Sequence, residues 1–232
     1  MVSEINFLLV GNSRLHWAKY SKHSKNQPKF FHTKKEQKVP ENIDLNQLIW
    51  ASVGELPNFL LKKENEIKTK VIKLSNLPDY FGVDRALACI AALKIIKNPF
   101  KKDLLIADFG TILSITKLNS NGSIIGGQLL PGFLTQLKSM EQNTKNLKVP
   151  QKYDIPIKDF LINTEEAILK GVINSLTSAI NSLLNPEKDI LIIWGGDSQL
   201  LTKSLKTKKE NIINAPNLVM EGMIIHHLSI KN

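Results

Sequence analysis

The chain has 232 residues, of which 42% are hydrophobic and 22% are charged, as in an ordinary folded globular protein. The one cysteine, Cys89, excludes a disulfide framework, and no apolar stretch approaches the roughly 20 residues of a membrane span. The N-terminal apolar run is too short for a signal peptide and lacks a basic segment before it, so we expect a cytoplasmic protein without a membrane partner.

The net charge of +10 raises the possibility of a nucleic-acid partner. Of the 31 basic residues, however, only Arg14 and Arg85 are arginines, whereas phosphate and base recognition favour the planar guanidinium. The basic run over 19–38 fits a nucleic-acid patch or a solvated hairpin, and we favour the hairpin. We therefore expect no nucleic-acid partner.

The first part of the chain alternates apolar runs with polar turns. The pattern predicts strands at 5–10, 15–20, 29–33 and 48–53. A helical pattern follows over 56–68, then a strand over 70–74, and then a strong helix over 83–96.

The second part of the chain has the same plan. We predict strands at 104–107, 112–118, 123–130 and 189–194, and helices at 133–147, 165–184 and 218–228. Aligning Gly11 with Gly110 sets Leu9 opposite Asp108. The order of elements predicts an internal duplication with domains at 1–99 and 100–232, joined by the Pro-containing basic segment at 97–102.

One glycine turn follows the first strand of each half of the chain. A glycine lets backbone N–H groups approach a phosphate, so Gly11, Asn12, Ser13 and Arg14 fit a phosphate-binding turn as well as a plain hairpin. Such a turn usually has an acidic residue two positions before the glycine, and here that position is Leu9.

The second turn does have that carboxylate. Asp108 ends a buried strand before Gly110 and Thr111, where it could bind a cation or only cap the turn. Gly195 and Gly196 follow a later strand and leave room for a flat ligand or a phosphate tail, or form a simple strand-to-helix turn.

A third motif opens the helix at 83–96. Gly82, Val83, Asp84 and Arg85 place a carboxylate in the first helical turn, where the helix dipole stabilises its ionised form. Asp84 could accept a proton from a substrate hydroxyl, and Arg85 suits a carboxylate or a phosphate. An acidic N-terminal residue beside a solvated arginine is the alternative.

Six motifs in this order, LVGNS, GVDR, DFGT, GGQLLPG, NTEEAILKG and WGGDS, resemble those of the type III pantothenate kinases, in the acetate and sugar kinase/Hsp70/actin superfamily. The resemblance spans nearly the whole chain. It implies an α/β fold of two duplicated ribonuclease-H-like (actin-like ATPase) halves, with mixed β-sheets flanked by helices, and a homodimer. The implied reaction is ATP-dependent phosphorylation of pantothenate, the first step of coenzyme A synthesis.

The resemblance also implies roles for individual residues. Asp84 becomes the general base, and Asp108 the ligand of a monovalent cation, K⁺ or NH₄⁺. The implied pantothenate-binding residues are Tyr80, Gly82, Val83, Asp84, Arg85 and Thr164. The implied ATP-binding residues are Val10, Gly11, Asn12, Ser13, Arg14, Thr111, Gly195 and Gly196. Mg²⁺ arrives with ATP, because magnesium keeps several waters and needs no full protein cage.

Two other functions are weighed against an active kinase. The missing carboxylate at Leu9 favours a catalytically impaired relative that binds nucleotide or pantothenate as a regulatory protein. A nucleic-acid-binding protein of ribonuclease-H-like fold would need several clustered carboxylates for metal-dependent cleavage. The glycine turns fit phosphate binding better, and we favour the kinase.

Overall fold

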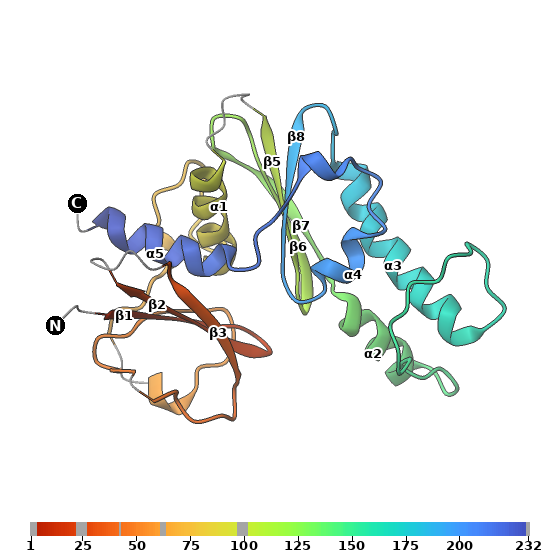
Figure 1. Ribbon diagram of the computed structural model, residues 1–232, viewed down its shortest axis with the longest axis horizontal. Coiled ribbons are helices and arrows are strands. Elements are labelled where there is room, and N and C mark those ends of the chain that lie inside the picture. Colours follow the sequence, from red (N-terminus) through yellow and green to blue (C-terminus); the bar gives the residue numbers. More distant parts are fainter. Residues whose placement is uncertain (1–3, 22–26, 42, 61–63, 97–101, 231–232) are drawn as a thin grey trace. The chain divides into compact units, whose positions relative to one another are not determined.

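The structure is a computed structural model of the chain (Figure 1). It describes residues 4–21, 27–41, 43–60, 64–96 and 102–230. The expected boundary at 97–102 lies, except for its last residue, outside these ranges. No helix in these ranges is both long enough and apolar enough to cross a membrane.

The chain forms two compact units. Unit 1 comprises Met1–Pro99, Gly122–Ile124 and Asn217–Asn232. Unit 2 comprises Phe100–Asn121 and Ile125–Pro216.

Unit 1 contains a four-stranded sheet. In sheet order the strands are β3 (Lys29–Lys34), β2 (Arg14–Ser21), β1 (Glu4–Val10) and β4 (Ile49–Ser52). Strand β2 is antiparallel to both β1 and β3, whereas β4 is parallel to β1. All four strands were predicted from the apolar patterning, to within a residue or two at each end.

One face of this sheet covers an apolar core. The buried residues of that core are Leu8, Val10, Leu15, Trp17, Leu48, Trp50 and Leu60. Each indole N–H finds an acceptor, because Trp17 donates to the hydroxyl of Thr33 at 2.9 Å and Trp50 to the carbonyl of Glu64 at 2.8 Å. Buried indoles thus bring their large apolar surface into the core with no unpaired donor.

Helices α1 (Val83–Ile95) and α5 (Leu218–Ile230) lie side by side on the sheet (Figure 1). Gly222 lets them approach, because a Cβ there would collide with the carbonyl of Leu87. The division at 99/100 assigned the last helix to the second half. Here α5 belongs to unit 1, because its apolar surface packs on α1.

Two predictions for the segment after β4 are wrong. In place of an α-helix over 56–68 the described residues contain a short 3₁₀ helix, η1 (Asn58–Leu60). An extended piece follows, in which the N–H of Ile67 donates to the carbonyl of Trp50 at 2.7 Å. Edge pairing with β4 therefore overrides the helical pattern. No strand forms at 70–74, all of which the structure describes. A 3₁₀ helix, η2 (Thr69–Val71), covers its first two residues.

Unit 2 is built on a five-stranded sheet. In order its strands are β7 (Ile124–Pro131), β6 (Ile112–Leu118), β5 (Asp103–Phe109), β8 (Asp189–Trp194) and β9 (Ile212–Asn214). The first residue of β7, Ile124, is grouped with unit 1. Strand β5 is antiparallel to β6 and parallel to β8, which is parallel to β9.

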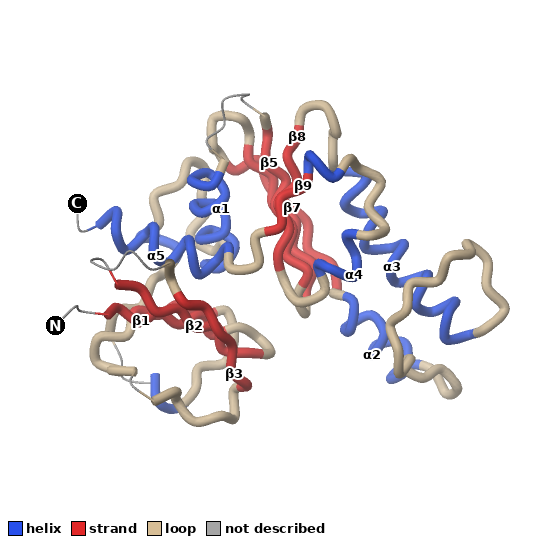
Figure 2. Tube along the Cα trace, viewed as in Figure 1, coloured by secondary structure: helices blue, strands red, loops and turns tan. Residues whose placement is uncertain are grey.

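Helices cover one face of the unit 2 sheet (Figure 2). They are α2 (Phe133–Asn143), α3 (Thr164–Leu183) and α4 (Ser198–Thr202), with a short 3₁₀ helix, η3 (Lys209–Asn211), before β9. The core alternates along the strands, with Leu105, Ala107 and Phe109 of β5 facing the helices. A helix was expected directly after the Gly195-Gly196 turn, and α4 begins there, whereas strand β9 was not expected from the sequence.

The two sheets repeat one plan. In each, the first strand lies between an antiparallel second strand and a parallel fourth strand. Leu9 pairs with His16 in unit 1, and Asp108 pairs with Ser114 in unit 2. The predicted fold class, two mixed sheets flanked by helices, is confirmed.

Candidate functional site

The first glycine turn connects β1 to β2 in unit 1. The N–H of Gly11 donates to the carbonyl of Arg14 at 3.0 Å and closes the turn. This amide is therefore used within the protein. The side chains of Asn12, Ser13 and Arg14 are exposed, so they are what the turn presents to a ligand.

Leu9 takes the position before this turn where an acidic residue was expected. It is only 3% exposed, and in the sheet its direct neighbours are His16 on β2 and Ala51 on β4. A leucine there offers no oxygen to a cation. Any charge that the first turn uses to hold an anion must come from other side chains.

Asp84 lies in the first turn of α1, as expected. Its Oδ1 accepts a hydrogen bond from the N–H of Arg85 at 2.7 Å. Burial raises the pKa of Asp84 above the ordinary range for aspartate, against the opposing effect of that hydrogen bond and of the Arg85 charge. A carboxylate with a raised pKa is a stronger base and is better suited to take a proton near neutral pH.

Arg85 is held by an aromatic ring. Its guanidinium carbon lies 4.0 Å from the centroid of Phe81, a cation–π contact. The loop that carries Phe81 is fixed in turn, because the hydroxyl of Thr69 donates to the Phe81 carbonyl at 2.7 Å. Sequence reasoning missed Phe81, although an aromatic residue four positions before an arginine is a visible signal for such stacking.

The second glycine turn and the Gly-Gly turn meet in unit 2. Gly195 follows β8 with φ of +95°, a left-handed conformation that favours glycine. A Cβ at Gly195 would lie 2.6 Å from Oδ1 of Asp108 and 2.6 Å from the carbonyl oxygen of Phe109. The structure therefore places Gly195 directly against Asp108.

The start of helix α2 is hydrogen-bonded to the second glycine turn. The carbonyl of Thr111 accepts hydrogen bonds from the N–H of Gly132 at 2.9 Å and from the hydroxyl of Thr135 at 2.7 Å. The N–H of Asp197 donates to the carbonyl of Phe109 at 3.1 Å. Both ends of the turn are thus anchored, and the Thr111 side chain remains exposed.

The oxygen atoms of this turn fit a hard cation better than a transition metal. Asp108 supplies a carboxylate beside the backbone carbonyls of its own turn, and hard cations take oxygen ligands. Within the described part of the chain, no group of three or more His, Cys, Asp or Glu side chains could hold a metal ion. A cation at Asp108 would therefore share its coordination with backbone, water or substrate.

Other predicted site residues lie in varied surroundings. Tyr80 is 92% exposed in the loop before α1, and Thr164 is exposed at the start of α3. Thr164 follows Asn163, whose side chain accepts from the N–H of Glu166 at 3.1 Å and caps the helix. Val10 is fully buried, and its carbonyl accepts from the N–H groups of Val53 and Gly54. The Val10 side chain therefore cannot reach a ligand.

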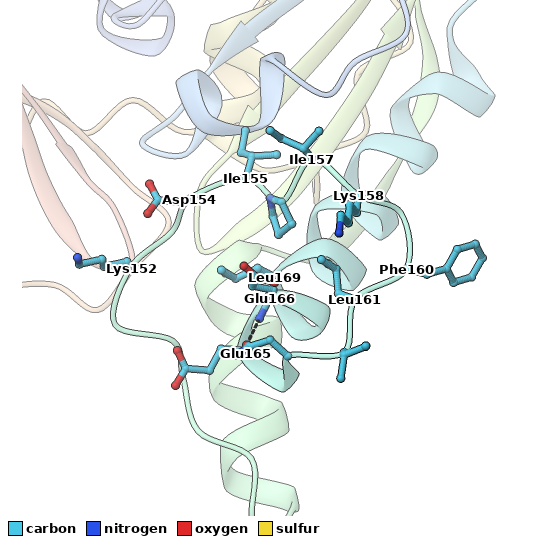
Figure 3. A pocket seen from close by; sticks show the side chains of 13 residues that line it. Lys152, Asp154, Ile155, Ile157, Lys158, Phe160, Leu161, Glu165, Glu166 and Leu169 are labelled. Atoms are coloured by element: carbon cyan, nitrogen blue, oxygen red, sulfur yellow. Dashed lines mark hydrogen bonds between the residues drawn. The ribbon is translucent and has the colours of Figure 1, made fainter.

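A cavity of about 750 Å³ lies beside the start of α3 in unit 2 (Figure 3). It is lined by the loop before the helix, including Lys152, Asp154 and Ile155, and by Glu166 and Leu169 of α3. Three apolar side chains of this loop are almost fully exposed: Ile157 at 97%, Phe160 at 95% and Ile162 at 104%. Sequence reasoning did not single out this apolar surface.

The predicted residues divide between the units. The Gly11 turn and the Asp84–Arg85 pair belong to unit 1, whereas Asp108, Thr111, Gly195 and Gly196 belong to unit 2.

Comparison with known proteins adds independent evidence. A family model described as type III pantothenate kinase matches residues 57–185. A protein named type III pantothenate kinase from Synechocystis sp. is 30% identical over 241 residues, which cover 95% of this chain and 89% of that protein.

Solved structures support the fold. A Campylobacter jejuni protein described as a Baf family transcriptional activator has a TM-score of 0.69 at 20% identity, covering 98% of this chain and all of that one. Component A of the (R)-2-hydroxyglutaryl-CoA dehydratase of Acidaminococcus fermentans has a TM-score of 0.54 at 12% identity, covering 97% and 96%. At these identities the likeness shows the fold alone.

Proposed function

Because the chain belongs to the type III pantothenate kinase family, and so phosphorylates pantothenate with ATP in coenzyme A biosynthesis, we propose that Asp84 is its catalytic base. The observation that carries this assignment is the partly buried Asp84 carboxylate, with its raised pKa, at the start of α1 beside Arg85. Gly82 and Val83 precede it in the same motif and border the substrate.

The reaction needs one proton transfer and one phosphoryl transfer. Asp84 takes the proton of the pantothenate hydroxyl while the hydroxyl oxygen attacks the γ-phosphorus of ATP. The bond between that phosphorus and the bridging oxygen, which leaves with ADP, breaks. Arg85 pairs with the pantothenate carboxylate, for which the guanidinium fork is suited. Positioning and charge neutralisation provide most of the catalysis in phosphoryl transfer.

The ATP-binding residues that we propose in unit 1 are Asn12, Ser13 and Arg14, whose exposed side chains suit the phosphates. Those that we propose in unit 2 are Thr111, Gly195 and Gly196. Asp108 holds a monovalent cation, K⁺ or NH₄⁺, which would neutralise phosphate charge, and Mg²⁺ enters with ATP. The contact between Asp108 and Gly195 supports this placement.

We further propose that the enzyme is a cytoplasmic homodimer. The three exposed apolar side chains Ile157, Phe160 and Ile162 on one loop support a partner surface in unit 2, because exposed large apolar groups are commonly covered in an assembly. Thr164 follows this loop, so the partner copy would come close to the pantothenate site. Tyr80 completes the pantothenate-binding set.

The test is the formation of phosphopantothenate by the purified full chain with ATP and Mg²⁺, in KCl or in NaCl. We expect product in KCl and much less in NaCl. Asp84→Asn should lower turnover by at least about 100-fold, the usual contribution of a general base. Asp79→Asn, the same change at an exposed aspartate five positions earlier, is the matched control and should leave turnover unchanged.

Two results would decide against the proposal. Wild-type protein that makes no product under any cation condition would contradict it, and so would Asp84→Asn that turns over like the Asp79→Asn control.

A further inference from the structure

The first glycine turn has a lysine beside it that no motif contains. Lys35 follows directly after β3, and its ammonium lies 3.1 Å from the point where a Cβ on Gly54 would be. The same Cβ on Gly54 would collide with the carbonyl group of Gly11. The ammonium of Lys35 is therefore an immediate neighbour of the turn that follows β1.

Backbone contacts hold this arrangement together. The N–H of Gly54 donates to the carbonyl of Val10 at 3.2 Å, so the segment after β4 is tied to the end of β1. The Lys35 ammonium makes a long hydrogen bond of 3.5 Å to the carbonyl of Glu55. Among the described residues no carboxylate lies within 4.0 Å of Lys35, so its charge is not neutralised by an ion pair.

The histidine beside the turn contributes little charge. His16 lies against Gly11, with Nε2 3.2 Å from the position of a Cβ there, and it packs edge-to-face on His32 at 4.7 Å. Burial, with the nearby His32 and Arg14, lowers the pKa of His16 to about 4. His16 is therefore neutral at pH 7, so the positive charge beside the turn comes from lysine and arginine side chains, among which Lys35 approaches the Gly11 carbonyl.

We propose that Lys35 is a phosphate-binding residue of the first turn, which supplies there the positive charge that Leu9 cannot recruit through a bound cation. The ligand class is the terminal phosphates of a nucleoside di- or triphosphate. The inference rests on the proposed nucleotide site, and it adds a residue from outside the glycine motif. A lysine suits this role because its ammonium acts as a point charge on a flexible stem.

The experiment is calorimetric titration of the full chain with ADP and Mg²⁺, and with adenosine as a ligand that has no phosphate. Lys35→Met should weaken ADP binding about tenfold, the effect of one lost charge-assisted hydrogen bond. Adenosine binding should stay unchanged. Lys29→Met is the matched control, because it removes the same charge from the opposite end of β3, and it should change ADP affinity less than twofold.

Thermal unfolding of each variant verifies that it is folded, and Lys35→Arg should restore most of the lost ADP affinity. Equal ADP affinity in wild type and Lys35→Met would overturn the inference, as would equal losses in Lys35→Met and Lys29→Met. The kinase assay is read separately. If the wild-type chain makes phosphopantothenate and Lys35→Met binds ADP with wild-type affinity, only the role of Lys35 is refuted. If the wild-type chain makes no phosphopantothenate and Lys35→Met has reduced ADP affinity, only the kinase assignment is refuted.

Discussion

The guanidinium carbon of Arg85 lies 4.0 Å from the centre of the Phe81 ring, directly before the helix that carries Asp84. This contact fixes the orientation of a side chain that would otherwise have many rotamers. A cation–π contact contributes about 0.5–2 kcal/mol, depending on how far water is excluded from it. Phe81 is therefore a positioning residue for the proposed carboxylate-binding arginine.

Phe81→Leu should raise KM for pantothenate by about threefold to tenfold, because the ring's attraction for the guanidinium is lost while the apolar volume is largely kept. The change in kcat should be smaller, and KM for ATP should stay the same. Steady-state kinetics with each substrate varied measures this split. Phe81→Tyr retains the aromatic face and serves as the control. If Phe81→Leu and Phe81→Tyr had equal KM values for pantothenate, the ring would not position Arg85.

Gly195→Ala should destabilise the protein by about 1–3 kcal/mol, because alanine is strained at φ of +95° and its Cβ would collide with Asp108 and Phe109. Gly196→Ala is the matched control, since a Cβ at that position meets no atom of the described residues within 4 Å apart from its chain neighbours. Denaturant unfolding of the two variants measures the difference. Loss of stability that was equal in both would show that Gly195 is not under special constraint.

Gly222→Ala should also lower the free energy of unfolding, because the added methyl group pushes α5 away from the Leu87 carbonyl of α1. At Gly171 in the middle of α3, a Cβ meets no atom within 4 Å among the residues that the structure describes, outside the adjoining helix backbone. The same change there should be neutral or stabilising by about 0.5–1 kcal/mol. Chemical denaturation compares the pair. Equal stability of Gly222→Ala and wild type would contradict the close packing of α5 on α1.

Asp84→Asn should stabilise the fold at neutral pH, by a few degrees in Tm. The pKa of Asp84 is raised in the folded state, so the folded protein holds this proton over a pH window in which the unfolded chain has already lost it. Stability therefore falls as pH rises through that window, from the ordinary aspartate value up to the raised one. Asparagine avoids this loss and can still accept the bond from the N–H of Arg85.

Thermal melts at neutral and at acidic pH test this relationship. The advantage of Asp84→Asn should be present at pH 7 and absent near pH 3.5. A variant that was less stable than wild type at pH 7 would show that the ionised carboxylate is well accommodated, against the raised pKa.

The strands and the main helices could be predicted from the sequence because local pattern and burial agree there. Apolar runs predicted eight strands, β1 to β8, and α1 and α3 have strong helical periodicity. The segment at 56–68 has a helical pattern too, but edge pairing of residue 66 with Trp50 on β4 decides its conformation. Such pairing depends on a distant strand, which a local pattern does not contain.

The site shows the same limit. The sequence predicted Asp108 because a glycine turn follows it, and Asp84 because it lies in the first turn of a predicted helix. Both signals are local. The contact of Gly195 with Asp108 joins residues 87 positions apart along the chain. Lys35 is one of many lysines in a basic run, and only the pairing of β3 with β2 brings it to the end of the sheet at which the Gly11 turn lies. The exposed side chains at 157–162 likewise follow from the loop's conformation.

The measurement that tests the central claim most directly is the pH dependence of kcat/KM for pantothenate, in wild type and in Asp84→Asn. Wild type should lose activity as pH falls, with a midpoint above the ordinary aspartate pKa of about 4, because the base must be ionised. Asp84→Asn should lie at least about 100-fold lower and lack this acidic limb. An Asp84→Asn variant that kept both the rate and the acidic limb would contradict Asp84 as the base.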